Sequence, residues 1–157
     1  MTNLGILEGY PDGTFRPDQP VTRGELAAIL ARLAEATEPK DKKTAFSDVD
    51  DHWAETEIHI IEEYGWIEGY EDKTFRPDAY ITRAEAVAMT NRALNRMPGY
   101  VYDLDENMYI WPDNADPEAW YFIDIQEASH SHDYERLRGT RSRWTKILEM
   151  PVKNQVE

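Results

Sequence analysis

One segment of this chain occurs twice, and the repetition restricts the folds open to the chain more than any other feature. Residues 5–25 align with residues 65–85 without a gap, and thirteen of the aligned residues are identical. In the first copy these are Gly5, Glu8, Gly9, Tyr10, Asp12, Thr14, Phe15, Arg16, Pro17, Asp18, Thr22, Arg23 and Glu25. Chance does not produce such a match, so the chain uses one structural unit at least twice.

A helix is predicted after each copy. Thr22 and Glu25 have the Thr-x-x-Glu spacing of a capping box, which closes the first turn of a helix, and Thr82 and Glu85 repeat it. Apolar residues follow at helical spacing, namely Leu26, Ile29, Leu30 and Leu33 in the first copy and Val87, Met89, Ala93 and Leu94 in the second.

A further amphipathic helix is predicted before the second copy only. Asp50 or Asp51 is its candidate N-cap, and Gly65 is its candidate stop. The apolar residues of one face are Trp53, Ala54, Ile58, Ile61 and Tyr64. No such segment stands before Gly5 in this sequence, so the first repeat is expected to be truncated.

The pattern changes beyond residue 100. Residues 111–128 resemble the opening of a third unit, but the loop and the capping box do not follow, and Arg143 stands where a box beginning at Thr140 needs Glu. We therefore predict a partial first repeat at 1–36, a linker at 37–45, a complete second repeat at 46–97 and a divergent third repeat at 98–157.

The second repeat resembles one S-layer homology repeat, and residues 5–33 resemble the second half of another. The residues that carry the resemblance in the second repeat are Phe46, Asp48, Trp53, Ala54, Gly65, Ile67, Gly69, Tyr70, Asp72, Phe75, Pro77, Ile81, Thr82, Arg83, Ala84 and Glu85. The resemblance implies a noncovalent anchor on the bacterial cell wall, with three repeats packed as a pseudo-threefold bundle. It also implies that the ligand is a secondary wall polysaccharide, often ending in a pyruvylated amino sugar. The Arg of the Thr-Arg-Ala-Glu motif is then a principal contact, which points to Arg23 and Arg83.

The chemistry of the motif fits an anionic ligand. Arg23 and Arg83 stand at the first helical position, beside the unsatisfied amides and the positive dipole end of a helix. A guanidinium there can pair with the carboxylate of a pyruvyl ketal through two hydrogen bonds. The candidate glycan-binding residues are Arg23, Arg83, Thr22, Thr82, Tyr10 and Tyr70, with Glu25 and Glu85 as structural caps.

Structural roles are the alternative for the same residues. The Thr and Glu side chains are sufficiently explained as helix caps. An Arg of this kind can also be a solvated or salt-bridged surface residue. Tyr10, Tyr70, Phe15 and Phe75 are interpreted as core residues that hold the loop, with contact between Tyr and a sugar as the second option.

The net charge of −14 argues against nucleic acid as a partner, because phosphate backbones are bound by basic surfaces. It argues against an anionic membrane as well, and no apolar run is long enough to span a bilayer. The chain has no cysteine and therefore no disulfide framework or thiol nucleophile. Its first residues lack a signal-peptide pattern, so an export signal is expected to lie outside this chain.

Other site chemistries have less support. Asp12, Thr14 and Asp18 lack the run of carboxylates that an EF-hand calcium loop requires. Two further sets of polar residues have the spacing of metal ligands but are typical of a solvated surface. One set is Glu55, His59 and Glu63, and the other is His130, His132 and Asp133. No carboxylate pair, Gly-rich phosphate loop or nucleophilic Ser has the arrangement of an enzyme site.

We therefore expect a mainly α-helical fold of tandem helix-loop-helix repeats with little or no sheet, no catalysis, and no cofactor or metal. The expected function is extracellular, at the cell wall or S-layer: anchoring an exported or S-layer protein through a secondary cell wall polysaccharide. Self-association or an S-layer partner is a further option. The alternative is a helical repeat module that binds a protein partner and no glycan.

Overall fold

The computed structural model describes residues 5–34, 44–139 and 141–149. The chain divides into two compact units, Met1–Thr82 and Arg83–Glu157. Most of the predicted linker, residues 37–43, lies outside the described residues, and the predicted repeat boundaries stay a prediction. Among the described residues, no helix is long and apolar enough to cross a membrane.

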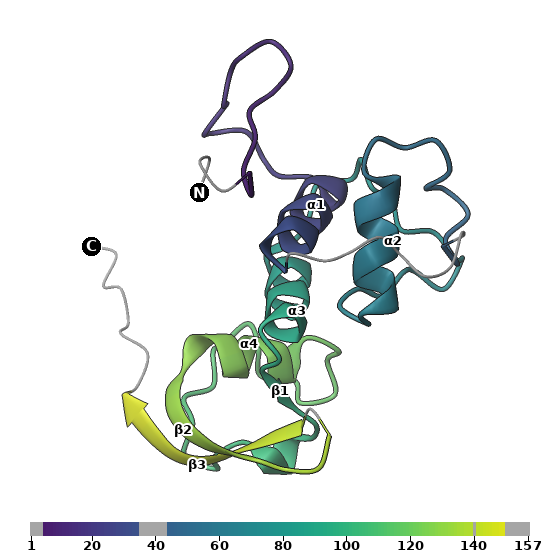
Figure 1. The fold of residues 1–157 in the computed structure, drawn as a ribbon. Coiled ribbons are helices and arrows are strands. Elements are labelled where there is room, and N and C mark those ends of the chain that lie inside the picture. Colours follow the sequence, from purple (N-terminus) through teal and green to yellow (C-terminus); the bar gives the residue numbers. More distant parts are fainter. Residues whose placement is uncertain (1–4, 35–43, 140, 150–157) are drawn as a thin grey trace. The chain divides into compact units, whose positions relative to one another are not determined.

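The described residues of the first unit form two helices, α1 (Arg23–Leu33) and α2 (Glu55–Glu63), which pack against each other (Figure 1). A long loop leads into α1, and a second loop follows α2. The buried apolar residues of this unit are Ala27, Ala28, Leu30, Ala31, Phe46, Val49, Ala54, Ile58, Ile60, Ile61, Ile67 and Phe75. The core therefore draws on both helices and on the second loop.

The boundaries of α2 differ partly from the prediction. The helix ends beside Gly65, whose φ of 69° is the left-handed conformation expected of a helix stop. Its N-cap is Ala54, so the prediction of Asp50 or Asp51 was wrong. Asp51 has a φ of 64° and its amide donates to the Glu55 carboxylate, which places the chain reversal before the helix rather than at its cap.

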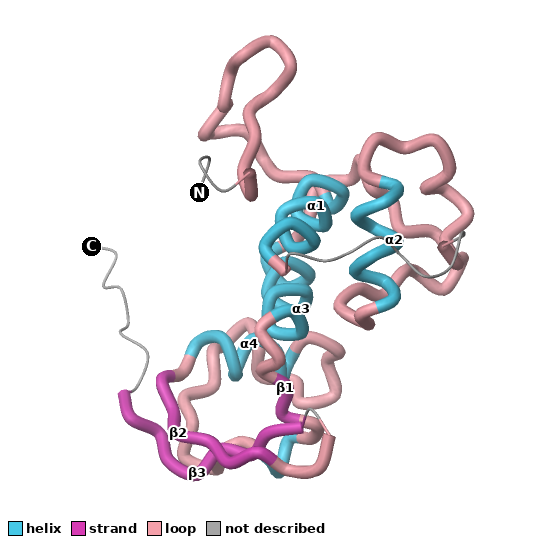
Figure 2. The backbone as a smooth tube through the Cα atoms, in the orientation of Figure 1, coloured by secondary structure: helices cyan, strands magenta, loops and turns pink. Residues whose placement is uncertain are grey.

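The second unit combines helices with a sheet. Its elements are α3 (Arg83–Ala93), β1 (Met97–Pro98), η2 (Val101–Asp103), α4 (Phe122–Ser129), β2 (Ser131–Arg136) and β3 (Arg141–Glu149). The strand order is β1-β3-β2, with β3 parallel to β1 and antiparallel to β2. Figure 2 shows these strands in magenta.

The sheet overturns the prediction of a mainly helical, pseudo-threefold bundle with little or no strand. Burial along β3 alternates, with Ser142 and Trp144 buried and Arg143 exposed between them, and this period of two is that of a strand. Gly139, at a φ of 77°, lies between β2 and β3. Trp144 completes a small core with Leu104 and Phe122, so burial of its ring favours the hairpin over a helix.

Candidate functional site

The first loop (residues 9–21) and the second loop (residues 69–81) contain the same side-chain network, which we call the Asp-Thr-Arg clasp. In the second loop, the amide and hydroxyl of Thr74 both donate to Asp72 Oδ1, at 3.0 and 2.6 Å. Arg76 Nη2 donates to Asp72 Oδ2 at 2.9 Å. The clasp of the first loop, formed by Asp12, Thr14 and Arg16, has the same bonds.

The clasp sets the ionisation of its carboxylates. Hydrogen bonds from Thr74 and Arg76 lower the pKa of Asp72 to about 2, from an ordinary value of 3.8. Hydrogen bonds from Thr14 and then Arg16 lower the pKa of Asp12 in the same way. The sequence contained a signal for this network, because Asp12, Thr14 and Arg16 all recur in the second copy. Sequence reasoning considered this segment only as a poorly supported calcium loop.

The start of α1 is closed by protein acceptors. Thr22 Oγ1 accepts from the Glu25 amide at 3.2 Å, and the Glu25 carboxylate accepts from the Thr22 amide at 2.8 Å, which completes a capping box. The Arg23 amide donates to Ala79 O and the Gly24 amide to Pro77 O. The amides at this helix start therefore all have acceptors, and none is available to an external anion without displacing one.

Arg23 is buried, with 4% of its surface exposed. Its Nε donates to Phe75 O at 2.7 Å and its Nη2 to Glu68 O at 3.4 Å. The guanidinium also lies over the rings of Phe75, at 4.5 Å, and Tyr70, at 4.9 Å. The Arg of the first repeat thus binds the second loop and joins the two repeats.

Gly24 explains a difference between the two copies of the motif, which read Thr-Arg-Gly-Glu at 22–25 and Thr-Arg-Ala-Glu at 82–85. A Cβ at Gly24 would lie 3.2 Å from Pro77 O and 3.1 Å from the His52 ring. The absence of a side chain therefore allows the second loop to lie close against the start of α1.

Arg83 has a different environment. It is the first residue of α3, it is exposed, and it forms no ion pair with another residue in the part of the chain that the structure describes. Thr82 precedes it and is also exposed, and Glu85 lies in the first turn. Of the two predicted arginines, Arg83 is the one that presents its guanidinium to solvent.

Tyr10 and Tyr70 hold their loops. The Tyr10 hydroxyl donates to the Glu25 carboxylate at 2.7 Å, and that contact raises the pKa of the Tyr10 phenol. The Tyr70 ring lies under Arg76 at 3.8 Å and also contacts Arg23. The Arg16 guanidinium lies over the Tyr10 ring at 4.1 Å. Both aromatic residues therefore contact guanidinium groups within their own unit, as expected for residues that hold the loop.

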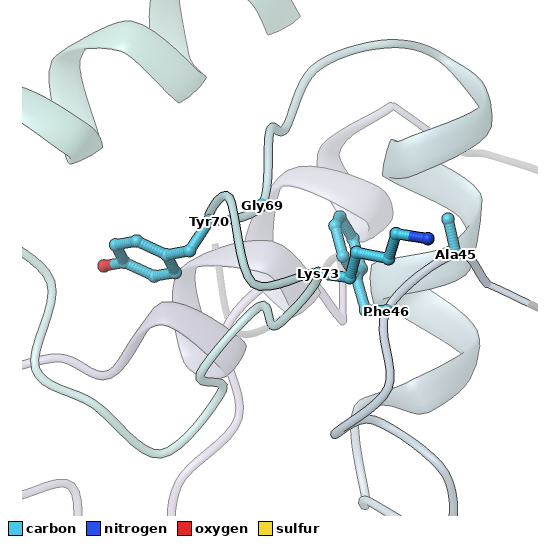
Figure 3. A pocket seen from close by; sticks show the side chains of 5 residues that line it. All are labelled: Ala45, Phe46, Gly69, Tyr70 and Lys73. Carbon is cyan, nitrogen blue, oxygen red and sulfur yellow. The ribbon is translucent and has the colours of Figure 1, made fainter.

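Tyr70 also borders a pocket of about 460 Å³. Figure 3 shows its lining, with Phe46 and Lys73 on one side of Gly69 and the Tyr70 ring pointing away on the other. Ala45 completes the lining. The Lys73 ammonium is the cationic group of this pocket, and sequence reasoning did not single it out.

The described residues of the second unit contain two ionic networks that sequence reasoning missed. Arg141 binds Asp103 through two hydrogen bonds of 2.7 Å, and that contact lowers the pKa of the Asp103 carboxyl. In the second network the buried Glu127 accepts from Trp144 Nε1 at 2.6 Å and pairs with His132. Thr140 lies outside the described residues.

The Glu127 network keeps a buried carboxylate ionised. Burial opposes the charge, but hydrogen bonds from His132 and Trp144, together with Arg96, outweigh it, so the pKa of Glu127 is lowered. Glu127 thus contacts three side chains at once, so this network has a structural role in the second unit. The described residues contain no group of three or more His, Cys, Asp or Glu side chains that could hold a metal ion.

Comparison with known proteins identifies the repeats. The S-layer homology domain model matches residues 1–27 and 45–87, which include both Thr-Arg pairs and the loops that precede them. These residues belong to the S-layer homology family. The resemblance noted in the sequence is thereby confirmed.

Several curated proteins are similar to the chain over most of its length. A cellulosome-anchoring protein of Acetivibrio thermocellus is 38% identical over 146 residues, which are 87% of this chain and 33% of that protein. Cell surface glycoprotein 1 of the same organism is 34% identical over 158 residues, 94% of this chain and 6% of that protein. A surface layer protein of Brevibacillus choshinensis is 32% identical over 99 residues, 60% of this chain and 9% of that protein.

The chain thus spans a third or less of these relatives. Family and relatives together confirm the predicted location at the cell wall or S-layer.

Proposed function

We propose that this chain is a noncatalytic anchor that holds a larger protein to the bacterial cell wall by binding a secondary wall polysaccharide. Membership of the S-layer homology family supports the anchoring role, and the names of the cellulosome-anchoring and surface layer relatives agree with it. We assign polymer binding to Arg83 because Arg83 is exposed at the start of an 11-residue helix.

Arg83 is the proposed direct contact with the polymer. A pyruvyl ketal on a terminal amino sugar carries a carboxylate, and a guanidinium presents two parallel donors to such a group. The positive end of the α3 dipole adds to the attraction for an anion. Thr82, exposed beside Arg83, is proposed to contribute its hydroxyl or to cap the helix that holds Arg83 in place.

The first repeat is proposed to supply a second contact, made by Arg23, Thr22, Tyr10 and Tyr70. A polymer carboxylate reaches Arg23 only if it displaces a carbonyl of the second loop, because Phe75 O already accepts from the guanidinium at 2.7 Å. We therefore expect the first repeat to contribute less to affinity than Arg83.

The net charge of −14 opposes binding of an acidic polymer only weakly at physiological salt. Exposed charges more than about 8 Å apart are largely screened there, so contacts at Arg83 dominate over distant carboxylates. Affinity per site is expected to be modest and to rise when two contacts on one polymer chain are made together.

The proposal is tested by calorimetric titration of the chain with purified wall polymer, native or stripped of its pyruvyl groups. Arg83→Ala is expected to weaken binding of native polymer at least tenfold. Arg138→Ala is the matched control, because Arg138 is also exposed and the charge change is the same.

The two halves of the proposal fail separately. Equal binding of native and pyruvyl-free polymer would remove the pyruvyl carboxylate as the recognised group. No binding of either polymer by a folded chain would favour the protein-binding alternative.

A further inference from the structure

His130 stands at the C-terminal end of α4 and exposes only 3% of its surface. The Tyr109 amide donates to His130 Nε2 at 3.0 Å, and His130 Nδ1 lies 3.0 Å from Gln126 O. A backbone amide can only donate and a carbonyl can only accept, so the ring makes both bonds when it is neutral and carries its proton on Nδ1. The fold therefore selects one neutral tautomer of a buried histidine.

The bond from Tyr109 attaches residues 105–111, the segment that follows η2, to the end of α4. A second attachment lies beside it, because Trp111 Nε1 donates to Ser129 Oγ at 3.0 Å, and Ser129 Oγ is 3.2 Å from His130 Nδ1. A proton on His130 Nε2 would make that nitrogen a donor that faces the donating Tyr109 amide. Protonation of His130 therefore breaks one of the contacts that hold this segment.

The charged groups around His130 oppose a second positive charge there. His132 of β2 faces an acceptor at each ring nitrogen, His130 O at 2.9 Å and Glu127 Oε2 at 3.2 Å, so its charged form makes both bonds. Arg96 also pairs with Glu127. Trp144 of β3 lies beside both histidines, with ring centroids 5.4 Å from His130 and 4.1 Å from His132. The two histidines thus favour opposite protonation states.

The direction of the pH effect follows from these contacts. Burial lowers the pKa of His130 below its ordinary value of 6.5, and the charge of His132 lowers it further, although the hydrogen bond to Gln126 O raises it. The unfolded chain then binds this proton more readily than the folded chain. The stability that neutral His130 contributes is present above about pH 6.5 and is lost as pH falls through the folded-state pKa. Protonation of His132 acts in the opposite sense, because its charged form makes both of its bonds.

We propose that His130 is an acid-sensitive switch that releases residues 105–111 from the end of α4 when its ring takes up a proton. The argument rests on the Tyr109 amide, which needs an unprotonated Nε2 as its acceptor, and on the burial of the ring. These residues lie outside the part of the chain that the S-layer homology model matches. The proposal is independent of polysaccharide binding, and it makes the second unit the part of the chain that responds to acidification of the medium.

The test follows the ¹⁵N-labelled full chain by NMR between pH 7 and pH 5. The hydrogen-exchange protection factor of the Tyr109 amide, which corrects for the intrinsic effect of pH on exchange, is expected to fall about tenfold over this range. The protection of Ile58, in the first unit, is expected to stay nearly constant. The ¹⁵N shifts of the His130 ring are expected to show an unprotonated Nε2 at pH 7, which titrates together with the loss of Tyr109 protection.

A variant separates His130 from other titrating groups. His130→Gln has a neutral side chain at every pH in this range, and it is expected to remove the pH dependence of Tyr109 protection. His52→Gln is the matched control, because it removes a histidine of the first unit, and it is expected to keep the wild-type dependence. The proposal is overturned if Tyr109 protection does not change between pH 7 and pH 5, or if His130 carries its proton on Nε2 at pH 7. It is also overturned if a folded His130→Gln chain keeps the wild-type pH dependence.

Discussion

Truncation of the two equivalent phenylalanines tests the asymmetry of the repeats most sharply. Phe75→Ala removes a ring that is 0% exposed, packs on Phe46 and supports the Arg23 guanidinium at 4.5 Å. A buried Phe→Ala change costs about 3–5 kcal/mol of unfolding free energy. Phe15→Ala removes a ring that is 59% exposed, and exposed substitutions change stability by no more than about 0.5 kcal/mol.

Native-state hydrogen exchange measures this difference within the first unit. The protection of buried α2 amides such as Ile58 and Ile61 reports the unfolding free energy of that unit without assuming that the whole chain unfolds in one step. We expect Phe75→Ala to lower the protection by a factor of at least one hundred and Phe15→Ala to leave it nearly unchanged. Equal losses for the two variants would refute the difference in burial on which the account rests.

Three further predictions follow from the described contacts. The pKa of Asp72 is lowered to about 2, so the Asp72 carboxylate stabilises the second loop fully above about pH 4, and this stabilisation is lost as pH falls through 2. An NMR titration of the Asp72 carboxyl with a midpoint near 4 would contradict the hydrogen bonds of the clasp. Thr22→Ala removes the N-cap side chain of α1 and is expected to lower the free energy of denaturant unfolding by about 1 kcal/mol. An unchanged free energy would mean that the capping box does not stabilise the helix. Glu127→Gln leaves buried partners of a carboxylate uncompensated and is expected to cost about 3 kcal/mol, whereas the exposed control Glu118→Gln is expected to cost almost nothing; equal effects in thermal unfolding would argue against the network.

Local signals in the sequence predicted local structure. The Thr-x-x-Glu spacing at Thr22 corresponds to a capping box in the structure, and the left-handed stop at Gly65 was also expected. These features depend on hydrogen bonds within four residues, so a single stretch of sequence specifies them. Tyr10, Tyr70, Phe15 and Phe75 were interpreted as core residues that hold the loop. Phe75 is buried and the contacts of Tyr10 and Tyr70 agree with a loop-holding role, but Phe15 is 59% exposed, so the core prediction was wrong for Phe15.

Features that depend on distant partners were not predictable in the same way. The burial of Arg23 depends on carbonyls of Glu68 and Phe75, which are about 50 positions away and carry no side-chain signal. The hairpin of β2 and β3 depends on burial of Trp144 against Phe122, so a short polar and aromatic run was assigned to a divergent helical repeat. Contacts with residues distant in the sequence therefore decided both the environment of Arg23 and the strand conformation of the hairpin.

Cosedimentation with purified bacterial wall sacculi tests the anchoring claim most directly, with the walls compared before and after extraction of the secondary polymer. We predict that the chain pellets with intact walls, stays in solution with extracted walls, and loses most of its binding in the Arg83→Ala variant but not in Arg138→Ala. Undiminished pelleting with extracted walls would contradict polysaccharide binding and would point to a protein partner.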